Sequence, residues 1–244
     1  MFVGLGTLIN VLSILVGASI GKFSGNRINE RTRELLTDIL GAVTLIGAAS
    51  ALISLWDESL VSALPEGAPI LVVLSSLLVG GLIGSWIRIE ERLNNWGESI
   101  KRRVSQGSES TFVEGFVTAS LIFVIGPLAI LGSISDGMGN GIDQLILKSI
   151  LDLFASIAFA ATLGWGVAFS ALPVGLYQGA WTLIGLALGS ILAEYQIAAM
   201  TATGGILLLG ISLRLLKIKS IAIGDLLPAL AIAPVIALAL ASIQ

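Results

Sequence analysis

The chain has 244 residues, of which 55% are hydrophobic and only 12% are charged, with a formal net charge of −3. A soluble domain has about 25% charged residues, so this composition is typical of a protein with several membrane-spanning helices. The sequence contains no Cys and no His. This excludes disulfides, thiolate nucleophiles and the commonest general base and metal ligand, and we expect no enzyme activity, no metal and no cofactor.

Eight predominantly apolar segments are long enough to cross about 30 Å of hydrocarbon as helices of roughly 20 residues. They are residues 2–21, 39–56, 68–87, 115–135, a span within 145–172, 173–193, 196–213 and 221–243. The runs are continuous rather than alternating, which excludes barrel strands. The first has no basic residue before it and is expected to be a retained helix rather than a signal peptide. The sequence therefore predicts an all-α polytopic membrane protein of about eight helices.

Basic residues gather in the connections that follow the first, third and seventh segments. These connections hold Lys22, Arg27, Arg31, Arg33, Arg88, Arg92, Lys101, Arg102, Arg103, Arg214, Lys217 and Lys219. Positive charge favours the cytoplasmic side of a membrane. We therefore predict that both termini lie outside the cytoplasm, and Lys148 is the one basic residue that departs from this pattern.

Residues 88–104 predict an amphipathic helix at the cytoplasmic membrane interface, because their apolar residues share one face. The sequence SQGSES at 105–110 follows and is predicted to be a hinge. We therefore expect a first membrane half of three helices and the amphipathic helix over 1–104, and a second half of five helices over 111–244.

Lys148 and Asp152 stand one helical turn apart inside an apolar segment, LILKSILDLF. The 41 uncharged residues between Asp152 and Glu194 must supply two spans and a turn, and we place the turn near Ser170 to Val174, where Pro173 breaks the helix. The fifth helix must then begin before Asp152. Both charges are expected to lie within the membrane.

Two interpretations of this pair remain open. In the first, Lys148 reaches toward the outer headgroups and pairs with Asp152 only to anchor the helix. In the second the pair marks a functional site, because a charge at the centre of a membrane helix costs about 2.5–3.5 kcal/mol and usually faces a protein interior or a water-filled cavity. Ser149 points about 100° away from Lys148 on the helix, which argues against a Ser-Lys nucleophile.

The segment FVIGPLAILGSISDGMGNGID at 123–143 precedes the pair. Pro127, following Gly126, should break the fourth helix. We expect the glycines after it to form a flexible loop that carries Asp136 and Asn140. Broken helices beside polar loops expose backbone groups to substrates in many transporters; a kinked helix before a surface loop is the alternative. Met138 and Leu147 stand where a calcium loop needs acidic ligands, so we reject a metal site.

Polar residues in the other predicted helices include Asn10, Thr7, Ser75, Ser76, Gln178, Thr201 and Thr203, and we expect them to form hydrogen bonds between helices. Glycines in several helices allow close contacts within one subunit or between two, so a homo-oligomer is open. The first three and last three helices are similar in plan. Because the first helix runs inward and the sixth outward, any three-helix repeat would have inverted topology and would flank the broken central pair.

The segments KSILD (148–152), GPLAILGSISDGMG (126–139), ATGGILLLGISL (202–213) and DLLPAL (225–230) resemble the YqgA/YdfK family of uncharacterised bacterial inner-membrane proteins. The resemblance covers the whole chain, includes Lys148, Ser149 and Asp152, and implies a multi-pass protein of the bacterial inner membrane. It implies no substrate.

Together these observations favour a small-solute or ion transporter or channel, with a structural or interaction protein as the alternative. The expected partners are membrane lipid and a small solute or ion, with no nucleic acid. The expected site residues lie at the charged pair, the helix break, the glycine-rich segment and the first helix: Lys148, Asp152, Ser149, Asp136, Asn140, Gly126, Pro127 and Asn10.

Overall fold

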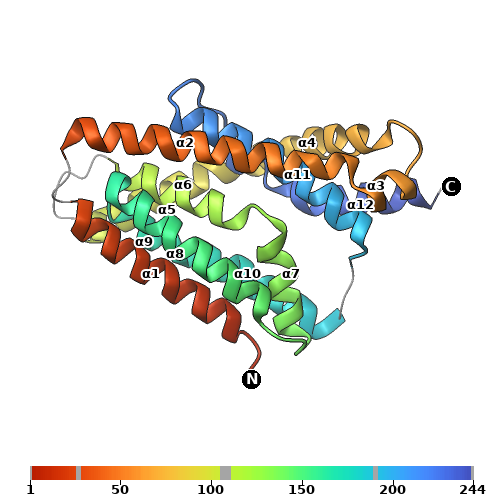
Figure 1. The fold of residues 1–244 in the computed structure, drawn as a ribbon, viewed down its shortest axis with the longest axis horizontal. Helices are drawn as coiled ribbons and strands as arrows, with labels where there is room; N and C mark the ends of the chain where they lie inside the picture. The colour runs from red at the N-terminus through yellow and green to blue at the C-terminus, as the bar shows by residue number, and fades with distance from the viewer. Residues whose placement is uncertain (1, 26–28, 105–110, 189–191, 243–244) are drawn as a thin grey trace. The chain divides into compact units, whose positions relative to one another are not determined.

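The computed structural model describes residues 2–25, 29–104, 111–188 and 192–242, and all regular secondary structure in these ranges is helical (Figure 1). The longer helices are α1 (Leu5–Gly25), α2 (Glu30–Leu52), α4 (Ala68–Ile87), α5 (Ile89–Val104), α8 (Asp143–Leu163), α10 (Ala171–Leu188), α11 (Glu194–Leu215) and α12 (Pro228–Ala241). The shorter ones are η1 (Ile53–Trp56), α3 (Glu58–Ala63), α6 (Phe112–Val124), α7 (Pro127–Gly137), α9 (Gly166–Phe169) and η2 (Ile223–Leu226). The prediction of an all-α protein is confirmed.

Seven helical segments within the described residues are long and apolar enough to cross a membrane, and counting the bent pair α6 and α7 as one span gives eight. The predicted break in the fourth helix is confirmed, since α6 and α7 are bent by 64°. Gly126 adopts φ 138° at the bend, a conformation that residues with a Cβ avoid. Pro127 opens α7, where its missing N–H costs no hydrogen bond.

The predicted turn near Ser170 to Val174 is wrong. The fifth span ends earlier, because α8 stops at Leu163 and Gly164 follows with φ 80°. Pro173 lies in the first turn of α10, where a residue has no intrahelical partner for its N–H, so proline is tolerated there. The expectation that this span begins before Asp152 is confirmed, since α8 begins at Asp143.

The predicted glycine-rich loop is also wrong in extent. Helix α7 continues through Gly137 and includes both Ser133 and Asp136. The Ser133 hydroxyl donates to the Ala129 carbonyl oxygen at 2.6 Å, so it is satisfied within the helix. A Cβ at Gly137 would collide with the Thr182 carbonyl oxygen of α10. This glycine therefore serves close helix packing rather than chain flexibility.

The chain forms two compact units. Unit 1 comprises Met1–Leu40, Leu93–Val124 and Leu128–Ile191, and unit 2 comprises Gly41–Arg92, Ile125–Pro127 and Leu192–Gln244. The predicted halves, 1–104 and 111–244, stay a prediction, and their boundary at 105–110 lies outside the described residues.

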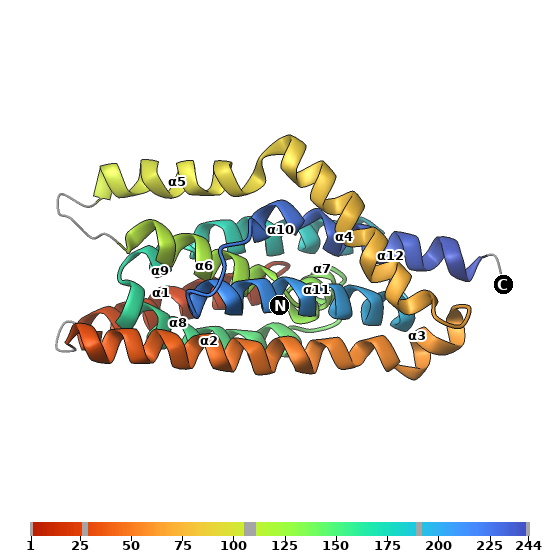
Figure 2. The ribbon, with the colours of Figure 1, turned by 90° about the horizontal axis from the view of Figure 1, so that it is seen from above.

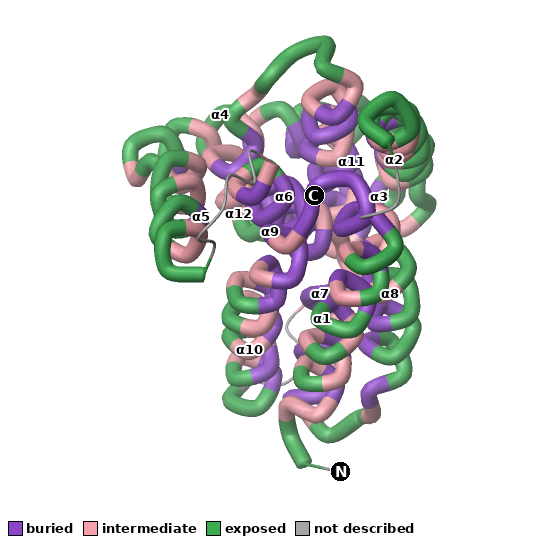
Figure 3. Tube along the Cα trace, turned by 90° about the vertical axis from the view of Figure 1, so that its left-hand side faces the viewer, coloured by how far each residue is buried: buried purple, intermediate pink, exposed green. Residues whose placement is uncertain are grey.

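In unit 1, α1 packs along α8 with the two helices running in the same direction. Glycines at every fourth position of α1 face the backbone of α8 in the same order: Gly17 faces Leu153, Gly21 faces Ile157 and Gly25 faces Ala161. Small residues at this spacing let two helix backbones approach closely in a membrane protein. Figure 3 shows α1, α8 and α10 with buried residues along one side and exposed residues along the other.

Helix α10 packs against α1 in the opposite direction. The hydroxyl oxygens of Thr7 and Thr182 are 3.4 Å apart, and one to two turns away Gly175 faces Val11. Since the residue numbers rise on one helix as they fall on the other, α1 and α10 are antiparallel.

In unit 2, α4 lies against α12 (Figure 2), with Gly80 facing Ala229 of α12 and Gly84 facing Asp225 of the preceding η2, so α4 and α12 are antiparallel. Helices α2 and α11 are antiparallel as well. Ser212 of α11 donates to the Gly41 carbonyl oxygen at 2.7 Å, and Gly205 faces Ala48 further along α2.

A polar network fixes the start of α5 within unit 2. Glu90 accepts from Arg214 at 2.5 Å and from the Gly224 backbone N–H at 2.6 Å. Asp225 accepts from the Glu90 backbone N–H at 2.8 Å, which satisfies a donor at the start of a helix that has no intrahelical partner. The acidic group at 225 is therefore engaged in capping α5.

The outer side of α4 is apolar. Leu74, Leu78 and Leu82 recur at every fourth position and are all exposed, and Trp86 near the helix end is 86% exposed. An exposed apolar stripe of this length is unfavourable in water and favourable against lipid, and tryptophan is enriched where a span meets the interface. The exposed faces therefore fit a membrane-spanning protein.

Replacing Gly21 by Ala tests the close approach of α1 and α8. The added Cβ would collide with the Ile157 carbonyl oxygen, so the helices must separate, at a cost of about 1–3 kcal/mol. We expect a lower Tm for Gly21→Ala in detergent. Gly47→Ala is the matched control, because a Cβ at Gly47 meets nothing within 4 Å, and it should leave the Tm unchanged or raise it. Equal effects of the two changes would contradict this packing.

Candidate functional site

Lys148 and Asp152 form a buried ion pair near the middle of α8. They are the sixth and tenth of its 21 residues, and each is only 6% exposed. Lys148 Nζ lies 2.5 Å from Asp152 Oδ2. Since the two residues are one helical turn apart, the regular helix itself brings their side chains together.

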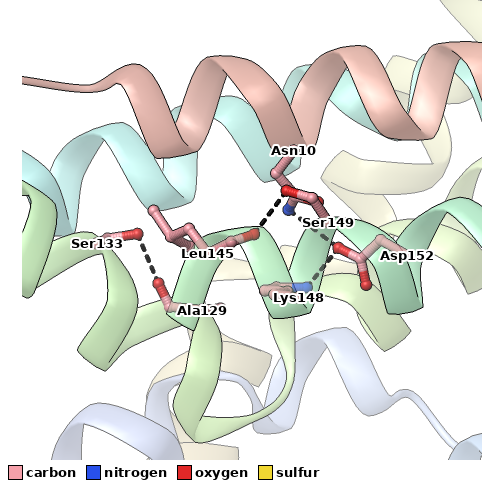
Figure 4. A network of polar contacts seen from close by, with 7 residues as sticks. All are labelled: Asn10, Ala129, Ser133, Leu145, Lys148, Ser149 and Asp152. Atoms are coloured by element: carbon pink, nitrogen blue, oxygen red, sulfur yellow. Dashed lines mark hydrogen bonds and ion pairs between the residues drawn. The ribbon is translucent and has the colours of Figure 1, made fainter. Parts of the chain in front are cut away.

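Side chains from two neighbouring helices contact the pair, and Figure 4 shows the one from α1, Asn10, beside Asp152. From α1, Asn10 is fully buried and its Nδ2 donates to Asp152 Oδ2 at 3.0 Å. From α6, the ring centroid of Phe123 lies 5.9 Å from Lys148 Nζ, within the range of a cation–π interaction. Phe123 also packs against Phe159 of α8, with ring centroids 6.5 Å apart.

These contacts define what the pair can do chemically. One carboxylate oxygen, Asp152 Oδ2, accepts from both Lys148 and Asn10. An ammonium group has three N–H donors, and Asp152 is the only hydrogen-bond acceptor that the described residues offer to Lys148. The site therefore presents a cation and an anion side by side with hydrogen-bonding capacity left on Lys148, and could bind a polar solute, an ion or a proton.

Ser149 lies beside the pair, but its hydroxyl forms a hydrogen bond within its own helix, α8. It is buried and its hydroxyl donates to the Leu145 carbonyl oxygen at 2.6 Å. Leu145 in turn packs between Gly6 of α1 and Gly132 of α7. Figure 4 shows Ser149 on the side of α8 that faces Asn10.

Asp136 accepts two hydrogen bonds from the backbone beside the start of α1, and its role as a binding residue stays a prediction. Its two carboxylate oxygens accept from the backbone N–H groups of Gly4 at 3.2 Å and Gly6 at 3.0 Å. These donors lie at the start of α1, where N–H groups lack intrahelical partners and a negative charge is stabilising. Asp136, 3% exposed, therefore links α7 to the beginning of α1 through these two hydrogen bonds.

The remaining predicted residues are not brought to the ion pair. Asn140 is exposed in the connection between α7 and α8, and its backbone N–H donates to Ser135 at 3.0 Å. Gly126 and Pro127 form the bend between α6 and α7 and follow three and four residues after Phe123. Phe123, shortly before the bend, places its ring beside Lys148 Nζ. No group of three or more acidic side chains in the described ranges is placed to hold a metal ion.

Comparison with known proteins agrees with the membrane architecture. A family model described as a protein of unknown function (DUF554) matches residues 5–238. The chain belongs to the DUF554 family. It is 32% identical to an uncharacterised membrane protein, YdfK, of Bacillus subtilis over 231 residues, which cover 95% of this chain and 94% of YdfK. It is 29% identical to the uncharacterised protein YqgA of Escherichia coli over 238 residues, with 94% of each chain covered. No solved structure gives a significant match.

One buried residue of this DUF554 protein was missed as a site candidate. Gln178 of α10 is fully buried, yet neither its Oε1 nor its Nε2 has a hydrogen-bond partner. Asn10 Oδ1 and Ser156 Oγ are also buried without a partner. A buried polar atom left unpaired costs about 1–3 kcal/mol, so these atoms need an explanation. The only signal in the sequence is a lone glutamine in an apolar helix.

The expectation of hydrogen bonds between helices holds for part of the polar set. It is confirmed for Thr7 and Asn10. It is wrong for the set whose hydroxyls donate to carbonyls one turn earlier in their own helices: Ser75, Ser76, Thr201 and Thr203. A hydroxyl can always reach that carbonyl in a helix, whereas a longer amide cannot satisfy itself in this way.

Asp136→Asn tests the cap on α1. An amide offers one acceptor oxygen and no charge, so one of the two backbone N–H groups loses its partner and we expect a loss of about 1 kcal/mol, measured as a lower Tm. Asp38→Asn is the control, because Asp38 is an exposed carboxylate on α2. A Tm for Asp136→Asn equal to that of the control would show that the carboxylate does not support α1.

A double-mutant cycle measures the coupling between Lys148 and Asp152. Lys148→Met or Asp152→Asn alone leaves one buried charge without its partner, which costs about 3–5 kcal/mol. We expect both single variants to have a lower Tm, and the double variant to recover most of the loss because no unpaired charge remains. Additive losses in the double variant would contradict the coupling.

Proposed function

We propose that this DUF554 protein is a small transporter or channel for an ion or small polar solute, with its site at Lys148 and Asp152. The single observation that carries the proposal is the burial of this pair within the first half of a membrane-length helix. A charge at the centre of such a helix raises the cost of insertion by about 2.5–3.5 kcal/mol, and a charge nearer its end by less. Apolar side chains of similar volume commonly replace a buried ion pair without loss of stability, so folding alone does not require these charges.

The bent pair α6 and α7 supports the proposal. Discontinuous membrane helices are where transporters expose backbone groups and helix ends to their substrates. Here the bend follows shortly after Phe123, the residue whose ring lies beside Lys148. A change at the bend would therefore move a side chain that contacts the charged pair.

The helix directions fit the inverted three-helix repeat of the proposal, and the position of both termini outside the bacterial inner membrane is proposed from the basic residues in the connections. Parallel packing of α1 and α8 is what alternating spans require for the first and fifth spans. The helices that would be equivalent in a three-helix repeat are α1 and α10, α2 and α11, and α4 and α12. Each of these three pairs packs antiparallel, as inverted topology requires.

A structural or interaction role without transport is the alternative, and one observation favours it. Asn10 of α1 donates directly to Asp152 of α8, so the polar cluster also holds two helices together. Enzyme activity is not part of the proposal, because the Ser149 hydroxyl donates to Leu145 rather than toward a base.

Transport is tested in liposomes that contain the purified chain. Stopped-flow light scattering follows entry of glycerol, urea, glycine or potassium chloride, and an internal pH dye follows protons. We expect one of these probes to enter faster than into empty liposomes, and Asp152→Asn and the Lys148→Met/Asp152→Asn double variant to abolish the difference.

The double variant separates the two functions because it should be nearly as stable as the wild type. Stable double-variant protein that no longer passes the probe supports a transport site. If it passes the probe at the wild-type rate, the charged pair is only a structural clamp. Wild-type liposomes that pass none of the probes contradict the proposal for these substrate classes.

A further inference from the structure

Asn10 of α1 and Gln178 of α10 are buried at the same level of two helices that pack against each other; we call them the amide pair. The antiparallel register is fixed on both sides, by Thr7 with Thr182 and by Val11 with Gly175. Gln178 lies between Gly175 and Thr182 on the same face of α10, which places it at the level of Asn10 on α1. Both residues are 0% exposed.

The two amides leave three of their four polar atoms unused. Asn10 Nδ2 donates to Asp152, but Asn10 Oδ1, Gln178 Oε1 and Gln178 Nε2 have no partner. Gln196, another buried glutamine, differs because both of its side-chain polar atoms have hydrogen-bond partners. Its oxygen accepts from the Ala193 backbone N–H at 2.8 Å and its nitrogen donates to the Pro234 carbonyl oxygen at 3.0 Å. Unused atoms are thus a property of the amide pair rather than of buried glutamines in this chain.

The chemistry of the three unpaired atoms defines which kind of molecule could bind there. The two amide oxygens require hydrogen-bond donors and the amide nitrogen requires an acceptor. A bare cation could contact only the oxygens and would leave Gln178 Nε2 unpaired. It would also add net charge beside an ion pair that is already neutral in sum, in a region of low dielectric where such charge is costly. A neutral molecule with both donors and acceptors avoids both problems.

We propose that the amide pair, together with Asp152 and Lys148, binds a small net-neutral solute that both donates and accepts hydrogen bonds. The inference rests on the proposed function, whose substrate class it names, and it assigns Gln178 as a binding residue. Asn10 joins the two parts of the site, because its nitrogen contacts Asp152 while its oxygen is free to accept from the solute.

Thermal unfolding of the full chain in detergent tests binding without transport. The probes are glycine, urea, glycerol, sodium chloride and potassium chloride at matched osmolarity. A solute that binds only the folded state raises the Tm in a saturable manner. We expect at least one of the three neutral solutes to do so, and neither salt.

Gln178→Leu and the closely isosteric Gln178→Met remove the amide without removing volume. Both should fold, because they replace an unpaired buried polar group, and both should weaken the apparent affinity for the solute by roughly tenfold or more. Gln196→Leu is the matched control, since it removes a buried amide far along the sequence whose atoms are paired. Its Tm should fall, while its affinity for the solute should stay at the wild-type value.

Three results would overturn the inference: a wild-type Tm that no neutral solute raises, a rise with the salts alone, or Gln178 variants that respond as the wild type does. The first result means that the amide pair holds structural water only. Transport is judged separately in liposomes. If flux is lost in Asp152→Asn but unchanged in Gln178→Leu, the protein is a transporter and the binding site proposed at Gln178 is wrong. If a solute raises the Tm only when Gln178 is present and no probe enters the liposomes, the binding site is supported and transport is rejected.

Discussion

The close approach of α1 and α8 is the contact on which the candidate site depends. Glycines at 17, 21 and 25 put the backbone of α1 directly against that of α8. An asparagine side chain is short, so Asn10 can reach Asp152 at 3.0 Å only when the two helices are this near. The same helix also packs against α10 through Thr7 and Val11, so the position of α1 sets the level at which Asn10 and Gln178 lie.

Two buried aspartates in unit 1 are stabilised by different kinds of hydrogen-bond donor. Asp136 receives two backbone N–H groups at the start of α1, donors that would otherwise lack partners. Asp136 therefore has a structural explanation, because it stabilises the start of α1. Asp152 instead pairs with a second charge, Lys148, one turn earlier in the same helix, and accepts from an amide, Asn10, of another helix. Residues that need such support without being needed for folding are the better candidates for function.

Glycine has a packing role in several parts of this chain. Gly17 and Gly21 of α1 and Gly80 and Gly84 of α4 all face the backbone of another helix. In hydrocarbon there is little hydrophobic force to hold helices together, so close van der Waals packing takes its place. Gly126 is the exception, since its positive φ is what allows the bend between α6 and α7.

The sequence by itself determined the helical membrane class, the approximate spans, the break at Gly126 and Pro127, and the contact between Lys148 and Asp152. Each of these follows from local properties: run length, proline chemistry and the spacing of one helical turn. Only the tertiary structure decided that Asn10 joins the pair, that Asp136 caps α1 from 130 residues away and that Gln178 is buried without a hydrogen-bond partner at the level of Asn10. These depend on helix register, which is set by the fit of distant surfaces, and no local pattern in the chain encodes that fit.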